Sequence, residues 1–384
     1  MNILSLKAFD FSLDDYDLIR ESVSEFEQLS DGNDPVQKDE AGHDSGKIDA
    51  ADATENFIEC PSSLIMWCVG LIYGRWDVRM ALDKSLIPEI ADQFDPLPAC
   101  SPGMLLAPDG YPATSGRIVS DEWLRNRINV LDVPKDVPNP TIPDENYPVA
   151  ISWDGILVDD EGHSNDIVKK VREILAVVYG EAADDREKEM LEVLGERSLR
   201  DYLRQPGKFF DFHIKRYSKS RRKAPIYWLL QTKRKNYGVW LYYHRLDSDI
   251  LFKVLRNYVE PKLKLISSQI SEMAQKTASL EGREKRACER ELEQLHELRQ
   301  EINEFREELE KVTEMGYNPN FDDGVILNMA PLHAVIPWKE PAKYWKELQA
   351  GEYDWAHIAM NYWPERIKAK CKKDKSLAIA HNVQ

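Results

Sequence analysis

The sequence predicts an α+β protein that is mainly helical and contains one or more short aromatic β-hairpins. Apolar residues recur at helical spacing over long stretches after residue 164. Two runs rich in aromatic and β-branched residues, 225–232 and 237–244, are separated by a cationic tetrapeptide, which is typical of a hairpin. Farther on, two apolar seams flank Gly282 and predict either a helical hairpin or a coiled-coil spacer.

Composition limits the classes of protein to consider. The 384 residues are enough for two or three domains, and the net charge of −16 argues against indiscriminate nucleic-acid binding, so any contact with DNA must be local. The five cysteines have no CxxC spacing, which fits a reducing compartment. We see no secretory signal at the start, and the apolar run 64–73 is too short to span a bilayer. We therefore expect a cytoplasmic protein.

The first part of the chain divides into two predicted segments. Residues 1–60 hold 16 acids and 4 bases and are expected to form an acidic, partly mobile segment with one helix over 14–29. Residues 61–150 are expected to hold a docking helix that starts at Ser62 or Ser63, followed by a proline-rich extended region. Eleven of the 21 prolines lie between residues 84 and 148. A short helix over 121–127 is expected there, and a disordered linker is the alternative.

The rest divides into three predicted segments. A basic and aromatic domain covers 151–258, with a helix capped by Ser164 or Asn165, and it is followed by a spacer over 259–315 and an aromatic C-terminal cap with a basic tail over 316–384. Short helices are expected over 187–194, 198–204 and 209–217, and another runs from Asp247 or Ser248 to Pro261. The spacer seams step by three and four residues through Leu263, Ile266, Ile270, Met273, Leu295, Leu298, Ile302, Phe305, Leu309 and Val312. They fit an antiparallel helical hairpin or one uninterrupted helix.

The most distinctive feature is a basic block inside this acidic chain. From Arg200 to Arg256 there are 15 Lys and Arg residues against 4 acids, a local charge of +11. So much positive charge is unfavourable unless an anion lies opposite, and nucleic acid is the commonest such partner. The candidate DNA-binding residues are Lys215, Arg216, Tyr217, Ser218, Lys219, Ser220, Arg221, Arg222, Lys223, Lys233, Arg234, Lys235 and Arg245. Most would hold phosphates, and one or two arginines would read base edges.

Two other interpretations of this block stay open. A cationic run can be a solvated face, or an ion-pair partner for acids of the same chain such as those in 1–60. The alternate aromatic residues of the hairpin are more often core than base-stacking side chains.

The sequence has no motif of a self-sufficient catalyst. There is no GxxxxGK[ST] loop, no GxGxxG after a strand, no HExxH, no paired Cys/His pattern and no Asn/Asp-Pro-Pro-Tyr/Phe tetrapeptide. Asp144, Glu187 and Glu189 match the acidic motif of a metal-dependent nuclease only poorly. We therefore expect no catalytic residue, no metal site and no cofactor in this chain.

Residues 216–228 and 240–245 resemble the C-terminal half of PglX-like and type IIG-like adenine-specific DNA methyltransferases, which belong to phage-defence systems of the BREX and DISARM types. Further segments that fit this family are 64–76, 94–98, 153–160, 323–325, 353–357, 362–366 and 374–381, so that the resemblance covers about residues 60–384. The methyl-donor loop and catalytic tetrapeptide of the family lie upstream of every matching segment.

The resemblance implies a target-recognition and spacer module that binds double-stranded DNA without its own methyl-transfer motifs. S-adenosylmethionine would be bound by a separate catalytic subunit or domain, so that this chain would be part of an adenine-N6 DNA methyltransferase in a restriction-modification-like system. The alternatives are an adaptor that joins proteins of a defence complex without touching DNA, and an enzyme whose site is assembled from scattered acids.

Overall fold

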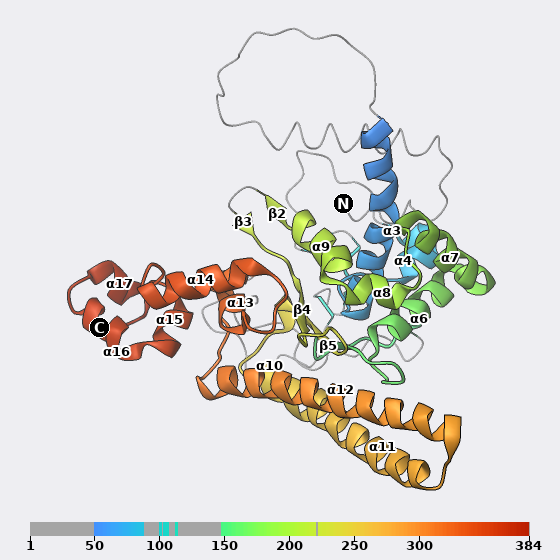
Figure 1. Ribbon diagram of the computed structural model, residues 1–384. Coiled ribbons are helices and arrows are strands. Elements are labelled where there is room, and N and C mark those ends of the chain that lie inside the picture. The colour runs from blue at the N-terminus through green and yellow to red at the C-terminus, as the bar shows by residue number, and fades with distance from the viewer. Residues whose placement is uncertain are drawn as a thin grey trace. The chain divides into compact units, whose positions relative to one another are not determined.

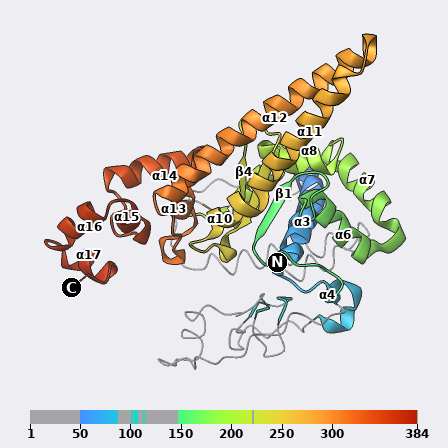
Figure 2. The same cartoon turned by 90° about the horizontal axis from the view of Figure 1, so that it is seen from below.

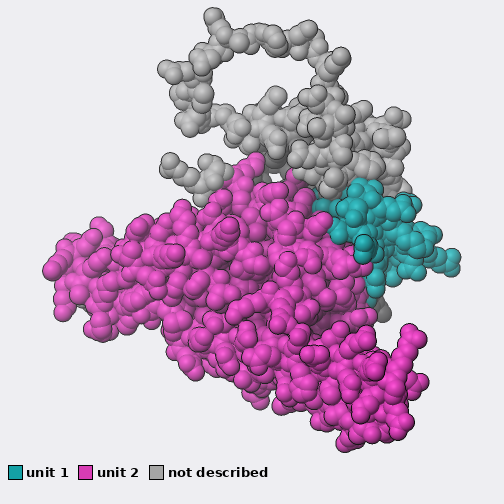
Figure 3. Space-filling view, in the orientation of Figure 1, with its two compact units in different colours: residues 1–151, 171–197 teal, residues 152–170, 198–384 magenta. Residues whose placement is uncertain are grey.

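The computed structural model describes residues 50–87, 100, 101, 103–106, 112, 113, 147–219 and 222–383, with only the backbone described for 50–60. The chain divides into two compact units (Figure 3). Unit 1 comprises residues 1–151 and 171–197, and unit 2 comprises 152–170 and 198–384. The helices expected over 14–29 and 121–127, and most of the proline-rich segment, lie outside the described residues. The division into five segments stays a prediction.

Unit 1 is built on a long helix, α3 (Ala50–Ile72), which packs against α7 (Ala183–Leu194). Its apolar residues Ile65, Cys68 and Leu71 are fully buried, so they serve the core of this unit. The helix does not start at Ser62 or Ser63 as expected, and Ser62 is itself buried. Apart from most of α6, which is described below, the remaining described helices of this unit are short: α4 (Arg79–Leu82), η2 (Lys84–Leu86) and η3 (Gly180–Ala182).

Unit 2 contains a three-stranded antiparallel sheet in the order β1 (Ile156–Asp159), β5 (Gly238–Tyr242), β4 (Tyr227–Gln231). Every residue of the three strands is buried. The predicted hairpin is confirmed as β4 and β5, with Trp228 opposite Leu241, while β1 was not predicted. The aromatic residues of the hairpin are therefore core, as the second interpretation had it.

Short helices directly precede the basic block in the sequence. Ser198 caps α8 (Leu199–Arg204) by accepting the Asp201 amide at 3.1 Å, as the predicted helix over 198–204 implied. The helix expected over 209–217 is confirmed in the main as α9 (Asp211–Arg216), which is preceded by a kinked turn, η4 (Pro206–Phe210). From these turns Phe209 and Phe210 place their rings 5.5 and 5.8 Å from that of Trp240.

The helix α6 (Ile167–Tyr179) follows β1, and residues 171–179 of it belong to unit 1. Its first turn is capped by Asp166, whose Oδ2 accepts the Lys169 amide at 3.1 Å. The expected caps, Ser164 and Asn165, lie two residues and one residue too early, respectively.

A helical hairpin of α11 (Glu260–Ala278) and α12 (Gly282–Glu314) forms the longest feature of unit 2, and the two helices lie side by side in Figures 1 and 2. Gly282 at the turn has φ +63°, a backbone conformation that suits glycine. The hairpin is preceded by α10 (Ile250–Val254) and a π-helical turn, η6 (Leu255–Val259). Pro261 is the second residue of α11 rather than the end of a helix, a first-turn position where a missing backbone donor is tolerated. The coiled-coil description and the spacer role stay predictions.

The C-terminal cap is helical, as expected. It consists of η7 (Phe321–Asp323), α13 (Val325–Met329), η8 (Ala330–Leu332), α14 (Lys339–Ala350), α15 (His357–Tyr362), α16 (Pro364–Cys371) and α17 (Lys375–Ala380). Buried Asp323 joins its parts by accepting the amides of His357 and Ile358, both at 2.7 Å. Within the described ranges, none of the helices combines the length and apolar character that crossing a membrane requires.

Candidate nucleic-acid interface

A short cationic ribbon follows the exposed end of α9 in unit 2. Its strands are β2 (Ser218–Lys219) and β3 (Arg222–Lys223), with Ser218 opposite Lys223 and Lys219 opposite Arg222. The bond from the Ala224 amide to the Tyr217 carbonyl, 3.1 Å long, extends this ladder toward α9. Ser220 and Arg221, which join the two strands, lie outside the described residues.

A buried histidine holds the base of this ribbon. His213 Nε2 on α9 accepts the backbone amides of Ile226 and Tyr227, at 3.0 and 2.9 Å, just before β4 begins. The His213 ring also lies 4.6 Å from that of Tyr217 and 4.7 Å from that of Tyr227. Residue 213, on α9, and residues 226 and 227, where β4 begins, are therefore held together by the His213 ring. The ribbon lies in the segment between these two anchored ends.

The charge on the ribbon is not neutralised by its neighbours along the chain. Asp211 is the only acid between residues 202 and 246, and it pairs with Lys215 at 2.9 Å. Lys219 and Arg222 are exposed and directly opposite each other, an arrangement that repels. Among the described residues, no carboxylate pairs with Lys219, Arg222 or Lys223.

The tip of the β4–β5 hairpin has a different environment from the ribbon. Arg234 donates its amide to Glu301 at 2.7 Å and pairs through Nη1 with Glu297 at 2.7 Å. Lys233 pairs with Glu304 at 3.3 Å, so that two of the three tip cations contact carboxylates of α12. The third, Lys235, donates to Gln205 Oε1 at 3.0 Å. The structure thus docks the tip on the helical hairpin instead of leaving it as a prong.

Arg245 lies apart from both groups. Its guanidinium group stands 5.5 Å from the Trp153 ring centroid, and burial lowers its pKa. The structure therefore brings together Lys215, Arg216, Tyr217, Ser218, Lys219, Arg222 and Lys223, and places Lys233, Arg234, Lys235 and Arg245 elsewhere in unit 2.

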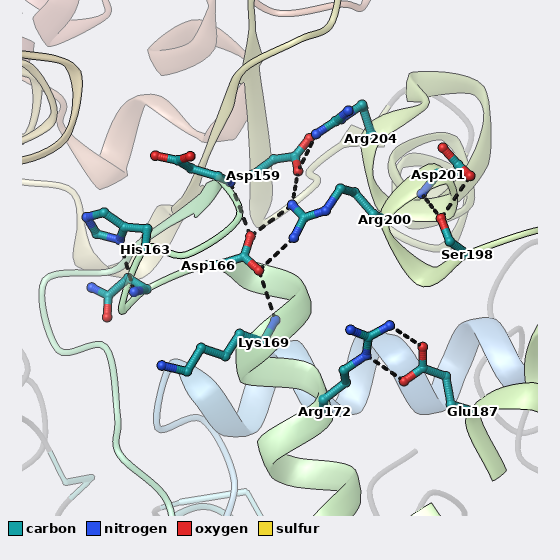
Figure 4. A network of polar contacts seen from close by, with 12 residues as sticks. Asp159, His163, Asp166, Lys169, Arg172, Glu187, Ser198, Arg200, Asp201 and Arg204 are labelled. Carbon is teal, nitrogen blue, oxygen red and sulfur yellow. Dashed lines mark hydrogen bonds and ion pairs between the residues drawn. The ribbon is translucent and has the colours of Figure 1, made fainter. Parts of the chain in front are cut away.

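A buried ion-pair network in unit 2, drawn in Figure 4, was missed in the sequence. Arg200 binds Asp159 through Nη1 at 2.5 Å and Asp166 through Nη2 at 2.9 Å. Arg204 also binds Asp159, through Nε at 2.5 Å and Nη2 at 3.0 Å. Burial lowers the pKa of Arg200, but its hydrogen bonds to Asp166 and Asp159 outweigh that effect and leave the pKa raised. The signal in the sequence that could have revealed this network is the spacing of Arg200 and Arg204, which places both side chains on one face of α8.

This network is structural. It links the end of β1 to α8. Both flanks of β1 are also tied to the helices that follow: Lys262 of α11 pairs with Asp160 after the strand at 2.5 Å, and Tyr258 of η6 donates to Asp154 before it at 2.5 Å. Each of the two central carboxylates, on Asp159 and Asp166, is already engaged by arginine. Across the described residues, no group of three or more His, Cys, Asp or Glu side chains is placed to hold a metal ion.

Comparison with known proteins gives two relatives. The adenine-specific methyltransferase BrxX of Escherichia coli O9:H4 (strain HS) is 29% identical over 193 residues, which are 46% of this chain and 15% of that protein. The adenine-specific methyltransferase PglX of Lacticaseibacillus casei (strain Zhang) is 24% identical over 199 residues, 49% of this chain and 16% of that protein. No family model matches.

Over about half of its length, the chain is similar to adenine-specific methyltransferases. The aligned part is a small fraction of each relative. The similarity supports the resemblance noted in the sequence at the level of the family.

Proposed function

We propose that this chain is a DNA-binding target-recognition module that works with an adenine-specific DNA methyltransferase. Two observations support the proposal. The relatives are named as adenine-specific methyltransferases, and the ribbon presents Lys219 directly across from Arg222 with no carboxylate on either among the described residues. The second observation carries the proposal, because it identifies a surface whose charge a polyanion would neutralise.

A ribbon of two strands suits duplex DNA in shape as well as in charge. The major groove is about 12 Å wide and admits a two-stranded β-ribbon as readily as an α-helix. In that position Arg222 would reach base edges, while Lys215, Lys219 and Lys223 would contact phosphates on either side. Arg216 and Tyr217 extend the same surface along α9.

The rest of unit 2 would set the position of the ribbon. The sheet, His213 and the ion-pair network fix its base, and the docked β4–β5 tip fixes the second half of α12 to the same core. The helical hairpin would act as the spacer toward a catalytic subunit or domain that binds S-adenosylmethionine. In this arrangement the chain reads the target and the partner transfers the methyl group, in a phage-defence system of the kind the resemblance implies.

The test compares two pairs of cations in duplex binding. The ribbon variant carries Lys219→Ala and Arg222→Ala, and the matched tip variant carries Lys233→Ala and Arg234→Ala. Binding of labelled duplex DNA, followed by fluorescence anisotropy over a salt titration, should show a slope of log K against log salt that is smaller by about 1 for each lost phosphate contact of the ribbon. The tip variant should keep the wild-type slope, because its cations are already paired within the chain.

Equal slopes and affinities for the wild type and the ribbon variant would contradict the assignment of the interface. If the wild type binds no duplex but still captures a methyltransferase subunit, the chain is an adaptor and not a reader of DNA.

A further inference from the structure

A row of three aromatic side chains in the C-terminal cap is formed by one residue of α14, Tyr344, and two residues of the loop between α14 and α15, Tyr353 and Trp355. The ring centroids of Tyr344 and Tyr353 are 5.7 Å apart at an interplanar angle of 24°, and those of Tyr353 and Trp355 are 6.4 Å apart at 80°. Trp355 is 48% exposed, although tryptophan is usually well buried. Neither the proposed ribbon nor the core uses this indole.

The exposure of Trp355 is built into the fold of its loop. On one side the buried carboxylate of Asp354 binds Arg366 at 2.7 Å and also Lys370, while its carbonyl lies 2.6 Å from His381 Nε2. On the other side Ala356 is fully buried and donates its amide to the Tyr353 carbonyl at 3.0 Å. With both neighbours fixed, the Trp355 side chain is directed outward, and ordering it costs little when a ligand binds.

Cations lie at both ends of the row. Lys343 stands 5.8 Å from the Tyr344 ring centroid and pairs loosely with Glu347 at 3.8 Å, its side chain remaining 64% exposed. The side chain of Lys370, 51% exposed, reaches the Asp354 carboxylate next to Trp355. The stretch 339–375 holds nine Lys and Arg residues against six acids, in a chain that is strongly acidic overall. One of those acids, Asp354, is buried and pairs with two of the cations, Arg366 and Lys370.

We propose that Trp355 and Tyr353 form a binding site for single-stranded nucleic acid, with Lys343 and Lys370 contacting the backbone. Sites of this kind combine aromatic faces, on which successive bases stack, with cations that follow the phosphates. A protein partner would also use tryptophan and tyrosine, but lysine is depleted in protein–protein interfaces and here it borders the aromatic row on both sides. The site is separate in sequence from the ribbon and does not depend on it.

The probe is labelled oligothymidylate of about 20 nucleotides, longer than the roughly 4–16 nucleotides that one such site covers. Anisotropy titrations of the full chain should show binding that Trp355→Ala weakens about 5- to 150-fold, the factor for one lost base stack. Trp355→Tyr should keep most of the affinity, because the replacement still offers an aromatic face. Phe252→Ala is the matched control, since Phe252 is 59% exposed but lies on α10, away from the row.

Three results would overturn the proposal: no binding of oligothymidylate by the wild type, an unchanged affinity of Trp355→Ala, or an equal loss in Phe252→Ala. Retained binding by Trp355→Tyr excludes misfolding as the cause of the loss. The ribbon variant Lys219→Ala, Arg222→Ala should bind oligothymidylate normally, and Trp355→Ala should bind duplex normally. These assays can therefore refute the single-strand site without refuting the duplex-binding ribbon, and the reverse.

Discussion

The buried network around Asp159 makes a sharp prediction about stability. In Asp159→Ala, the carboxylate that accepts three hydrogen bonds from Arg200 and Arg204, between 2.5 and 3.0 Å long, is removed. The Asp159 side chain is only 2% exposed, whereas those of Arg200 and Arg204 are 18% and 27% exposed. The substitution therefore leaves cationic groups near the end of β1 without one of their two carboxylates.

The loss of stability expected for Asp159→Ala depends on which arginine still has a carboxylate partner. Breaking a buried ion pair from one side costs about 3–5 kcal/mol, because a charge is left behind without compensation. Arg200 keeps both contacts to Asp166, at 3.0 and 2.9 Å, and Arg204 is partly open to water. We therefore expect the lower end of that range, about 3 kcal/mol, for the unfolding of unit 2.

Urea denaturation followed by tryptophan fluorescence measures this loss. With a denaturant dependence of about 3 kcal/mol per molar urea, the midpoint should fall by about 1 M. Lys368→Ala is the control in the same unit, because it breaks an exposed pair with Glu365, at 3.5 Å, and should change stability by at most about 1 kcal/mol. If the two variants have the same midpoint, the network does not stabilise unit 2 in the way argued.

Three further predictions test other parts of unit 2. Gly155→Ala should destabilise more than Gly162→Ala in denaturation experiments; both glycines have positive φ, at +70° and +87°, but only the Cβ at 155 would meet another atom, at 2.5 Å from Arg245 Cβ. Glu301→Ala, which removes the buried acceptor of two bonds from the hairpin tip at 2.7 and 2.8 Å, should cost about 1–3 kcal/mol and increase hydrogen exchange at the tip. Burial, followed by the hydrogen bond to Glu347, raises the pKa of Tyr353 to about 12, so its contribution to stability is present below its ordinary pKa of 10 and is lost as the pH rises to 12. Tyr353→Phe should accordingly show a smaller loss of stability over that interval than the wild type.

Local periodicity was enough to predict the elements that form from neighbouring residues. The two runs rich in aromatic and β-branched residues predicted β4 and β5, because a tight turn joins strands whose partners are close in sequence. Gly282 separated α11 from α12, because a glycine with positive φ reverses the chain between two apolar seams. In both cases the residues that predict the chain reversal lie within a few residues of the turn.

Elements that depend on distant partners could not be predicted in this way. Strand β1 has four buried residues without alternation, and it exists because it pairs with β5 about 80 residues later. The cap of α6 was placed too early because Ser164, Asn165 and Asp166 can all cap a helix. Asp166 takes the role in the structure, where Arg200 from another helix holds the same carboxylate.

The two cationic groups of the basic block show how tertiary contacts decide the role of a charge. The tip and the ribbon look alike in sequence, but α12 carries Glu297, Glu301 and Glu304 at spacings of four and three, which places the carboxylates on one face. That face lies against the tip and pairs with its cations, whereas on the ribbon Lys219 lies directly opposite Arg222, with no carboxylate on either among the described residues. Of the two groups, the ribbon is therefore where an added polyanion lowers the energy most. Salt should weaken the docking of the tip while relieving the repulsion within the ribbon, so that ionic strength separates the structural cations of the tip from the ribbon cations that we propose bind DNA.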